Sequence, residues 1–237
     1  MMYLSTTEST DSIDSVNTVD AIYNNNSYPN DVLIPLGKHR GIPMFMQRSV
    51  ALIALIVVSP ILLITMVLIC IESKGNCFFS QDRIGKFGRH FCMYKFRSMY
   101  LKNDRLYEEP DPTTSDRPGV CKKYKADPRI TKVGRVIRKY SIDELPQLYN
   151  IVTGDMALIG PRPALSMEVD AYPVSALSRL NGMPGISGLW QVSGRANTDF
   201  QTQVELDQWY LNEQSIWLDF YILFATVPSV ITAKGSY

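Results

Sequence analysis

Two adjacent carboxylates, Asp143 and Glu144, are the residues of this chain whose types and spacing most directly suggest chemistry. They close a Ser-Ile-Asp-Glu sequence with the S-x-x-E form of a capping box, and Pro146 is tolerated only in a first helical turn. We therefore expect a helix to begin near Asp143, whose carboxylate would stay ionised in the positive end of the helix dipole, available as a nucleophile. Such caps are common, so this spacing alone favours a plain helix start.

Cations near this pair strengthen the chemical interpretation. Arg135 and Arg138 precede it at a helical spacing of three, and a Gly-Pro-Arg-Pro sequence holds Arg162 between two prolines. A glycine-punctuated run, in which glycines would allow close backbone approach to a ligand, ends at Arg195. Carboxylates beside several cations suit a metal-assisted phosphoryl transfer, in which the cations balance the charge of the phosphate oxygens.

The elements that must position these residues begin with two short strands, expected at residues 77–84 and 91–99 around a Gly85…Gly88 turn. Period-2 alternation puts Lys95 and Arg97 on one face of the second strand. A basic helix is expected from residue 129 onward, before the acidic pair.

The strongest single feature is an uncharged segment at residues 50–71, flanked by Arg48 and Glu72. As a helix it would be about 33 Å long, enough to match a hydrocarbon core of roughly 30 Å. A buried core helix is the alternative, but such helices rarely run so long without a polar face. We expect this segment to enter a lipid bilayer.

Pro60 interrupts that segment at its midpoint and removes the helical partner of the Ile56 carbonyl. The Ser59 hydroxyl can donate back to the same carbonyl. Basic residues flank the segment on both sides, whereas a simple span should show that bias on one side. We expect a helix–break–helix that enters and leaves by the cytoplasmic face, with a kinked span as the alternative.

Composition excludes several other classes. The net charge is +1, which gives no support to nucleic-acid binding. Five acidic and no basic residues lie in residues 1–37, which we expect to be a disordered acidic leader. The four cysteines form no C-x-x-C pair, which argues against structural zinc.

Residues 216–231 are apolar and aromatic but too short to span, so an interfacial helix and ordinary core packing both stay open.

Six ordered motifs then carry a specific resemblance. They are YKFRSM at 94–99, DPRIT at 127–131, SIDELPQL at 141–148, GDM at 154–156, GPRP at 160–163, and the glycine-punctuated run at 184–195. From about residue 44 to its C-terminus, the chain resembles the bacterial sugar transferase family, the monotopic polyprenyl-phosphate phosphoglycosyl transferases.

The resemblance implies a re-entrant helix broken at Ser59-Pro60 and a catalytic dyad of Asp143 and Glu144 that helps to hold a magnesium ion, Mg2+. It implies that the aspartate attacks the β-phosphate of a UDP-sugar, releases UMP and passes the phosphosugar to undecaprenyl phosphate. Phosphate-binding roles are expected for the four cations of the matching motifs and the basic helix: Lys95, Arg138, Arg162 and Arg195.

These inferences give a fold of the α+β class, mainly helical. We expect a membrane-inserted re-entrant helix at 44–73 and a membrane-associated cytosolic domain at 74–237, with a short β-hairpin and interfacial amphipathic helices. The enzyme would sit in the bacterial inner membrane with its active site on the cytoplasmic face, and a homo-oligomer stays open.

The short cytosolic domain and the C-terminal sequence look most like the transferases that initiate exopolysaccharides. Galactose-1-phosphate is therefore the expected group, glucose-1-phosphate the second choice, and an N-acetylated sugar is disfavoured. Gln47-Arg48 stands where the family usually has Lys-Arg, which affects the anchoring of the membrane helix. The rival function is a catalytically silent scaffold of a polysaccharide assembly complex, which would have no need of an intact dyad.

Overall fold

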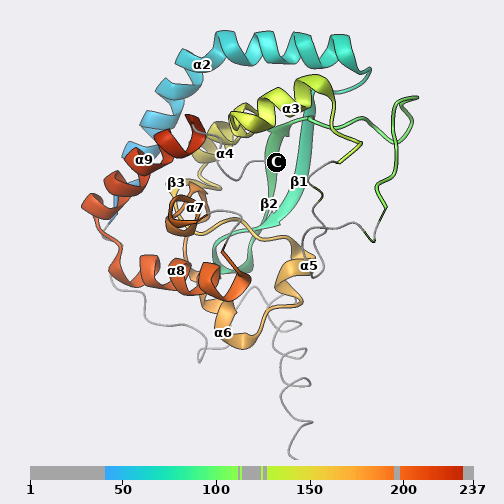
Figure 1. The fold of residues 1–237 in the computed structure, drawn as a ribbon. Coiled ribbons are helices and arrows are strands. Elements are labelled where there is room, and N and C mark those ends of the chain that lie inside the picture. Colours follow the sequence, from blue (N-terminus) through green and yellow to red (C-terminus); the bar gives the residue numbers. More distant parts are fainter. Residues whose placement is uncertain (1–40, 112, 114–123, 125–126, 195–197, 232–237) are drawn as a thin grey trace, which may run out of the picture.

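The computed structural model describes residues 41–111, 113, 124, 127–194 and 198–231. The predicted leader and Arg195 lie outside the described residues. The described chain is mainly helical, with two small two-stranded sheets (Figure 1). Its elements in chain order are α2 (Met44–Glu72), β1 (Phe78–Ile84), η1 (Lys86–Gly88), β2 (His90–Phe96), α3 (Lys132–Lys139), η3 (Ile142–Glu144), α4 (Gln147–Thr153), β3 (Ala157–Ile159), α5 (Ser166–Val169), α6 (Val174–Leu177), η4 (Ser178–Asn181), β4 (Gly185–Ser187), α7 (Leu189–Ser193), α8 (Phe200–Glu213) and α9 (Ile216–Ile231).

The long apolar segment forms one 29-residue helix, α2, which is long and apolar enough to cross a membrane by length and composition. The chain stays helical through Pro60, and Figure 1 shows a bend near the middle of the helix. The predicted interruption is therefore a bend within one helix. The Ser59 hydroxyl donates to the Ile56 carbonyl at 2.7 Å, which satisfies the acceptor that Pro60 leaves without its usual partner.

The N-terminal end of α2 is hydrogen-bonded to the globular part of the chain. The Gln47 side chain is buried, donates to the Ile42 carbonyl at 2.7 Å and accepts from the Leu158 amide at 2.7 Å. Arg48 donates to the Val152 carbonyl at 2.8 Å, in the last turn of α4. These contacts fix the start of α2 against α4 and β3.

The C-terminal end of α2 is held by the same globular part. The Glu72 carboxylate accepts from the Lys132 and Val133 amides at 2.6 and 2.8 Å, which caps the first turn of α3. The buried Arg97 donates to the Ser73 carbonyl at 2.7 Å. Both ends of α2 therefore hydrogen-bond one body of protein.

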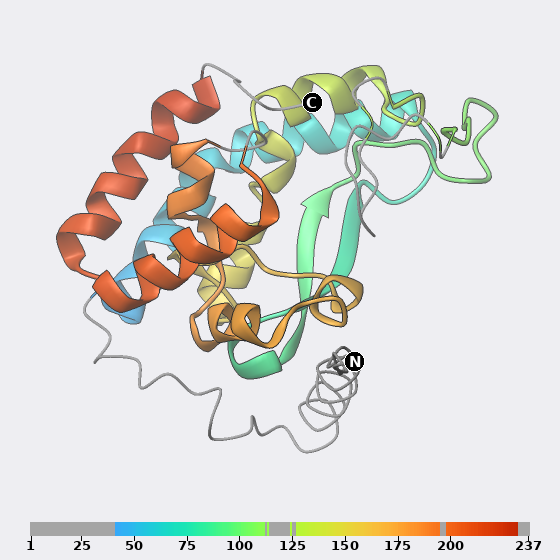
Figure 2. The same cartoon turned by 60° about the horizontal axis from the view of Figure 1, so that its bottom comes forward.

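The predicted hairpin is present, with β1 antiparallel to β2 and Ile84 opposite His90. The second strand ends at Phe96, earlier than expected, and Met99 pairs instead with Ile130 in an isolated bridge. The hairpin lies under α3, beside the loops that precede α5 (Figures 1 and 2). One face of β2 packs into the core through Met93.

A second, parallel pair of strands, β3 and β4, was not expected from the sequence. A Cβ atom on Gly160 would collide with the Met183 carbonyl, and one on Gly185 would collide with the Gly160 amide. These glycines therefore serve close packing between backbone segments. Of the two, Gly185 belongs to the glycine-punctuated run, and it also lines the candidate pocket, so the expected close approach to a ligand there stays a prediction.

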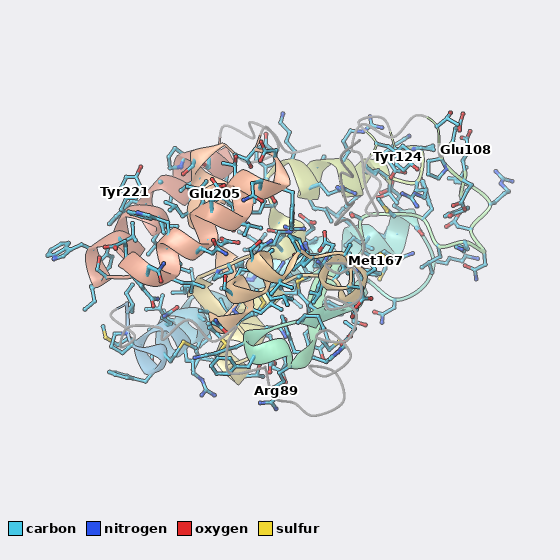
Figure 3. All side chains as sticks on the ribbon, turned by 90° about the horizontal axis from the view of Figure 1, so that it is seen from below. Arg89, Glu108, Tyr124, Met167, Glu205 and Tyr221 are labelled. Carbon is cyan, nitrogen blue, oxygen red and sulfur yellow. The ribbon has the colours of Figure 1, made fainter. Side chains whose placement is uncertain are left out.

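Helix α9 has two different faces. Asp219 and Ile222 are fully buried, and the Asp219 carboxylate accepts from the Ile42 amide at 2.8 Å and the Tyr210 hydroxyl at 2.7 Å. The opposite face carries Trp217, which is 83% exposed, and Tyr221, which lies at the periphery of the molecule (Figure 3). Core packing therefore accounts for one face of this helix and leaves an aromatic face uncovered.

Candidate active site

Asp143 and Glu144 lie in the single 3-10 turn η3, between α3 and α4. The predicted capping box is absent, because Ser141 adopts a left-handed backbone (φ 54°) and its side chain makes no capping hydrogen bond. An N-cap residue needs an extended backbone to present its oxygen to the following amides. The α-helix begins later, at Gln147, so the prediction that a helix dipole keeps Asp143 ionised is wrong.

Burial raises the pKa of Asp143 to about 6, and the negative charge of Glu144 acts in the same direction. The cations Lys95 and Arg138 oppose this shift. Among the described residues, no other residue donates a hydrogen bond to the Asp143 side chain. Apart from a hydrogen bond with its own backbone amide, the Asp143 carboxylate is therefore unengaged. Together with a pKa near neutrality, this suits a nucleophile or a proton acceptor.

Glu144 behaves in the opposite way. Burial acts to raise its pKa, but the nearby cations Lys95 and Arg162 outweigh that effect and hold the pKa below its usual value. The Lys95 ammonium donates to the Glu144 carboxylate at 2.6 Å. The environment thus separates the two pKa values, a pattern that gives paired carboxylates different roles.

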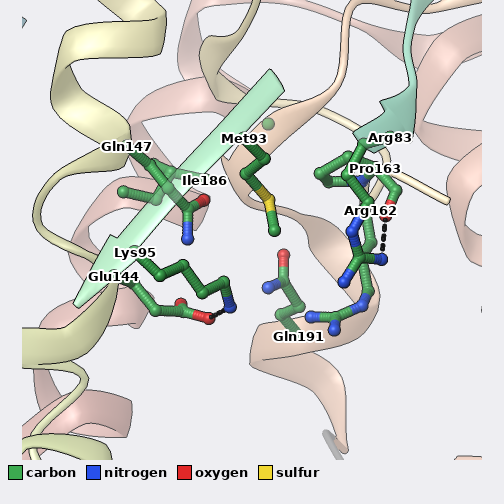
Figure 4. A pocket seen from close by; sticks show the side chains of 10 residues that line it. Arg83, Met93, Lys95, Glu144, Gln147, Arg162, Pro163, Ile186 and Gln191 are labelled. Atoms are coloured by element: carbon green, nitrogen blue, oxygen red, sulfur yellow. Dashed lines mark hydrogen bonds and ion pairs between the residues drawn. The ribbon is translucent and has the colours of Figure 1, made fainter. Parts of the chain in front are cut away.

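Glu144 lines a pocket between β2, the loop after β3 and the β4–α7 segment (Figure 4). Lys95 and Arg162 converge there as predicted, although they come from segments 67 residues apart. Arg138 approaches the dyad from α3 and acts on Asp143, which is not among the described residues that line this pocket. The dyad therefore lies between the pocket cations and α3.

Arg83 is a pocket residue that the sequence interpretation missed, since it counted only as a basic flank of the membrane segment. Its side chain is buried and donates to the Pro163 carbonyl at 3.0 Å and to the Gln81 side chain at 2.7 Å. Arg83 thereby ties β1 to the loop that carries Arg162. The hairpin register pairs Arg83 with Phe91, so strand alternation was the signal that could have placed it on the Lys95 face.

Asp143 and Glu144 are the carboxylates that this site offers to a metal ion. Within the described residues, no group of three or more His, Cys, Asp and Glu side chains could hold a metal, so an all-protein cage is not present there. Mg2+ is usually bound by one or two carboxylates together with substrate phosphates and water. Asp143, with its unengaged carboxylate, and Glu144 fit that smaller donor set.

Comparisons with known proteins identify the family. The model of the bacterial sugar transferase family matches residues 39–233. This chain belongs to the bacterial sugar transferase family. It is therefore an enzyme that associates with a membrane, and the resemblance seen in its motifs is confirmed.

Three relatives illustrate what this family member is similar to. The exopolysaccharide production protein ExoY of Rhizobium meliloti is 40% identical over 79% of this chain and 84% of its own length. The undecaprenyl-phosphate galactose phosphotransferase of Salmonella typhimurium is 40% identical over 81% of this chain and 42% of its own. The UDP-N-acetylgalactosamine-undecaprenyl-phosphate N-acetylgalactosaminephosphotransferase of Aeromonas hydrophila is 39% identical over 86% of this chain and 47% of its own.

Proposed function

We propose that this sugar transferase moves a hexose-1-phosphate from a UDP-hexose to undecaprenyl phosphate and so begins the assembly of an exopolysaccharide. The observation that carries the proposal is the unengaged Asp143 carboxylate beside Glu144, with Lys95 and Arg162 gathered next to it. The reaction named for the Salmonella relative and the role named for ExoY agree with this chemistry.

In the first step the Asp143 carboxylate attacks the β-phosphorus of the UDP-hexose. The bond between that phosphorus and the bridging oxygen breaks, and UMP leaves with the electron pair. The product on the enzyme is an acyl phosphate that carries the hexose. Lys95 and Arg162 hold phosphate oxygens during this exchange, when charge is spread over them. Arg138 balances charge on the Asp143 side.

In the second step an oxygen of undecaprenyl phosphate attacks the same phosphorus and the Asp143 carboxylate leaves. The hexose is then joined to the lipid through a diphosphate, and Asp143 returns to its starting state. Arg195 is proposed as a further phosphate-binding residue from its motif alone. Mg2+ held by Asp143 and Glu144 would supply positive charge to the diphosphate when bound.

We propose galactose as the transferred sugar, with glucose as the second choice. The Salmonella relative is named for galactose, but the Aeromonas relative, of similar identity, is named for N-acetylgalactosamine. Overall identity therefore does not separate these sugars, and the choice depends on residues in the pocket.

The membrane helix is proposed to be re-entrant, with both ends on the cytoplasmic side of the inner membrane. Gln47 and Arg48 at one end of α2, and Glu72 at the other, hydrogen-bond backbone groups of a single globular body. A helix that crossed the bilayer would separate its ends by a hydrocarbon layer of roughly 30 Å. The bend at Pro60, where Ser59 satisfies the carbonyl, is compatible with a helix that enters and returns.

The exposed apolar side chains of α2 and the aromatic face of α9 are proposed to contact the same bilayer. Monomeric soluble proteins rarely expose so many large apolar side chains together. On α2 they include Ile53, Ile56, Val57, Leu63, Ile64 and Ile71, and on α9 they include Trp217, Tyr221 and Phe224. This arrangement would hold the dyad near the headgroups, where the phosphate of the acceptor lies.

Release of UMP tests the proposed function. Purified enzyme in lipid nanodiscs is incubated with undecaprenyl phosphate and, in turn, UDP-galactose, UDP-glucose and their N-acetylated counterparts. We expect UMP release with a UDP-hexose and a labelled hexose in the lipid fraction. A variant with Gln201→Met, an exposed change on α8, should release UMP as the parent does. An enzyme that releases no UMP from any of these sugars would instead support the scaffold.

A further inference from the structure

Two amide side chains, Gln147 and Gln191, line the pocket together with its charged residues (Figure 4). Gln147 begins α4 and is 3% exposed. The amide oxygen of Gln191, on α7, is buried and has no hydrogen-bond partner in the described part of the chain. Buried polar groups are normally hydrogen-bonded, so the unpaired Gln191 oxygen, in a pocket that Gln147 also lines, points to a partner that a ligand supplies.

The chemistry of an amide narrows the choice of that ligand. An amide both donates and accepts, whereas ionised phosphate oxygens only accept, so a buried amide oxygen needs an O–H or N–H donor. In a UDP-hexose those donors are sugar hydroxyls and the uracil N–H. Met93 and Ile186 add apolar surface to the same pocket, which suits the C–H face of a sugar ring.

The position of the amides relative to the dyad favours the hexose over the nucleotide. In an in-line displacement the leaving group lies opposite the attacking oxygen, so UMP would point away from Asp143. The hexose is bonded to the phosphorus under attack and stays beside the dyad. Gln147 follows Glu144 by three residues and lines the same pocket.

We infer that Gln147 and Gln191 bind hydroxyl groups of the hexose and so hold the sugar of the donor beside the dyad. The inference rests on the proposed function, which it deepens by assigning the sugar subsite. Lys95 and Arg162 serve the diphosphate, while the two amides serve the uncharged part of the donor.

Binding measured apart from turnover tests this assignment. Gln147→Met and Gln191→Met keep the length of the side chain and remove its hydrogen-bonding groups. Each is made in the full chain together with Asp143→Asn, so that the donor is bound but not consumed. Calorimetric titrations use UDP-galactose and UDP-glucose as donors and UMP as the probe without a hexose. Gln201→Met in the same background is the control.

We expect each change to weaken the tighter of the two UDP-hexoses by about tenfold or more, as for a lost hydrogen bond to a substrate group, and UMP by less than about twofold. Equal weakening of UMP would overturn the assignment in favour of the nucleotide, and unchanged binding of both would overturn it in favour of packing. A melting temperature equal to that of the background, measured without ligand, shows that the fold is kept. Failure of the proposed function appears separately, as absent UMP release by the parent.

Discussion

Asp143 is the proposed nucleophile, and the environment that makes its carboxylate reactive also costs the fold stability. Burial raises its pKa from the ordinary value of 3.8 to about 6, so the folded chain favours the protonated form. Stabilisation from that proton is fully present below the unfolded pKa and is lost as the pH rises through about 6. The ionised nucleophile at pH 8 is therefore a destabilising group, as strained or buried catalytic groups often are.

Asp143→Asn tests this claim because the amide imitates the protonated carboxyl at every pH. We expect turnover to be abolished, since an amide cannot form the acyl phosphate, while the melting temperature at pH 8 rises above that of the parent. The gain should grow between about pH 4 and pH 6 and stay constant above. Scanning calorimetry across that range measures it. A variant that turns over, or a gain that is the same at pH 4 and pH 8, would contradict the assigned role and environment.

Arg162 gives a second residue-scale prediction. Arg162→Lys keeps the charge but replaces a planar fork of donors with a single ammonium, which cannot bind two phosphate oxygens in the same way. We expect kcat/KM for the UDP-hexose to fall by about tenfold or more, equivalent to roughly 1.4 kcal/mol or more. Steady-state kinetics with Arg89→Lys, an exposed hairpin residue, provide the comparison. Equal kinetics in the two variants would leave the Gly-Pro-Arg-Pro loop as a structural turn.

At this scale the sequence predicted which cations meet the dyad but not how the dyad is held. Lys95, Arg138 and Arg162 all affect the pKa of Asp143 or Glu144, and their expected phosphate-binding role stays a prediction. The left-handed backbone of Ser141 was not predictable, because the S-x-x-E pattern is satisfied by a different local conformation. Tertiary contacts with the hairpin and α3 determine the backbone conformation around Ser141, and a local sequence pattern does not encode such contacts.

At the scale of elements, α2 shows which structural features sequence composition can predict and which it cannot. The apolar run predicted the helix and Pro60 predicted the bend, because both depend on the local backbone. The hydrogen bonds of Gln47 and Glu72 to distant backbone amides depend on where the chain returns, which no local pattern predicts. The parallel β3–β4 pair was not predicted, because strands of three residues are too short to show an alternating pattern.

The element-scale prediction is that both ends of α2 are cytoplasmic. Phe45→Cys and Arg89→Cys, two exposed positions, are made singly in a variant without the four native cysteines. Gly41 is unsuitable, because a Cβ there would collide with the Asp219 side chain. We expect neither cysteine to react with a membrane-impermeant thiol reagent in intact cells, and both to react after lysis. Labelling of the residue-45 position from outside would mean that α2 spans the bilayer.

Pro60→Ala tests whether the proline, or the hydrogen bonds at the helix ends, keeps both ends of α2 on the cytoplasmic side. The change returns an amide donor to the Ile56 carbonyl and removes the reason for the bend. We expect the straightened helix to cross and the cysteine at position 45 to become reactive from outside. Persistent protection would mean that the hydrogen bonds of Gln47 and Glu72 at the helix ends hold the bend without help from the proline.

At the scale of the whole molecule, the uncovered aromatic face of α9 and the exposed apolar side chains of α2 are expected to set the depth of the active site. Trp217 reports on this directly, because it is 83% exposed and amphipathic aromatic side chains favour the membrane–water interface. In a chain with Trp190 and Trp209 replaced by Phe, we expect brominated lipids to quench its fluorescence. Quenching by a water-soluble quencher alone would contradict an interfacial α9.

A single turnover without the lipid acceptor tests most directly whether Asp143 is the nucleophile. Purified enzyme and UDP-galactose are mixed with no undecaprenyl phosphate present, and both UMP and the digested protein are analysed by mass spectrometry. We expect about one UMP per active enzyme and a hexose phosphate on the peptide that contains Asp143, both absent from Asp143→Asn. UMP that appears only after undecaprenyl phosphate is added, or a hexose phosphate on a different residue, would contradict that role.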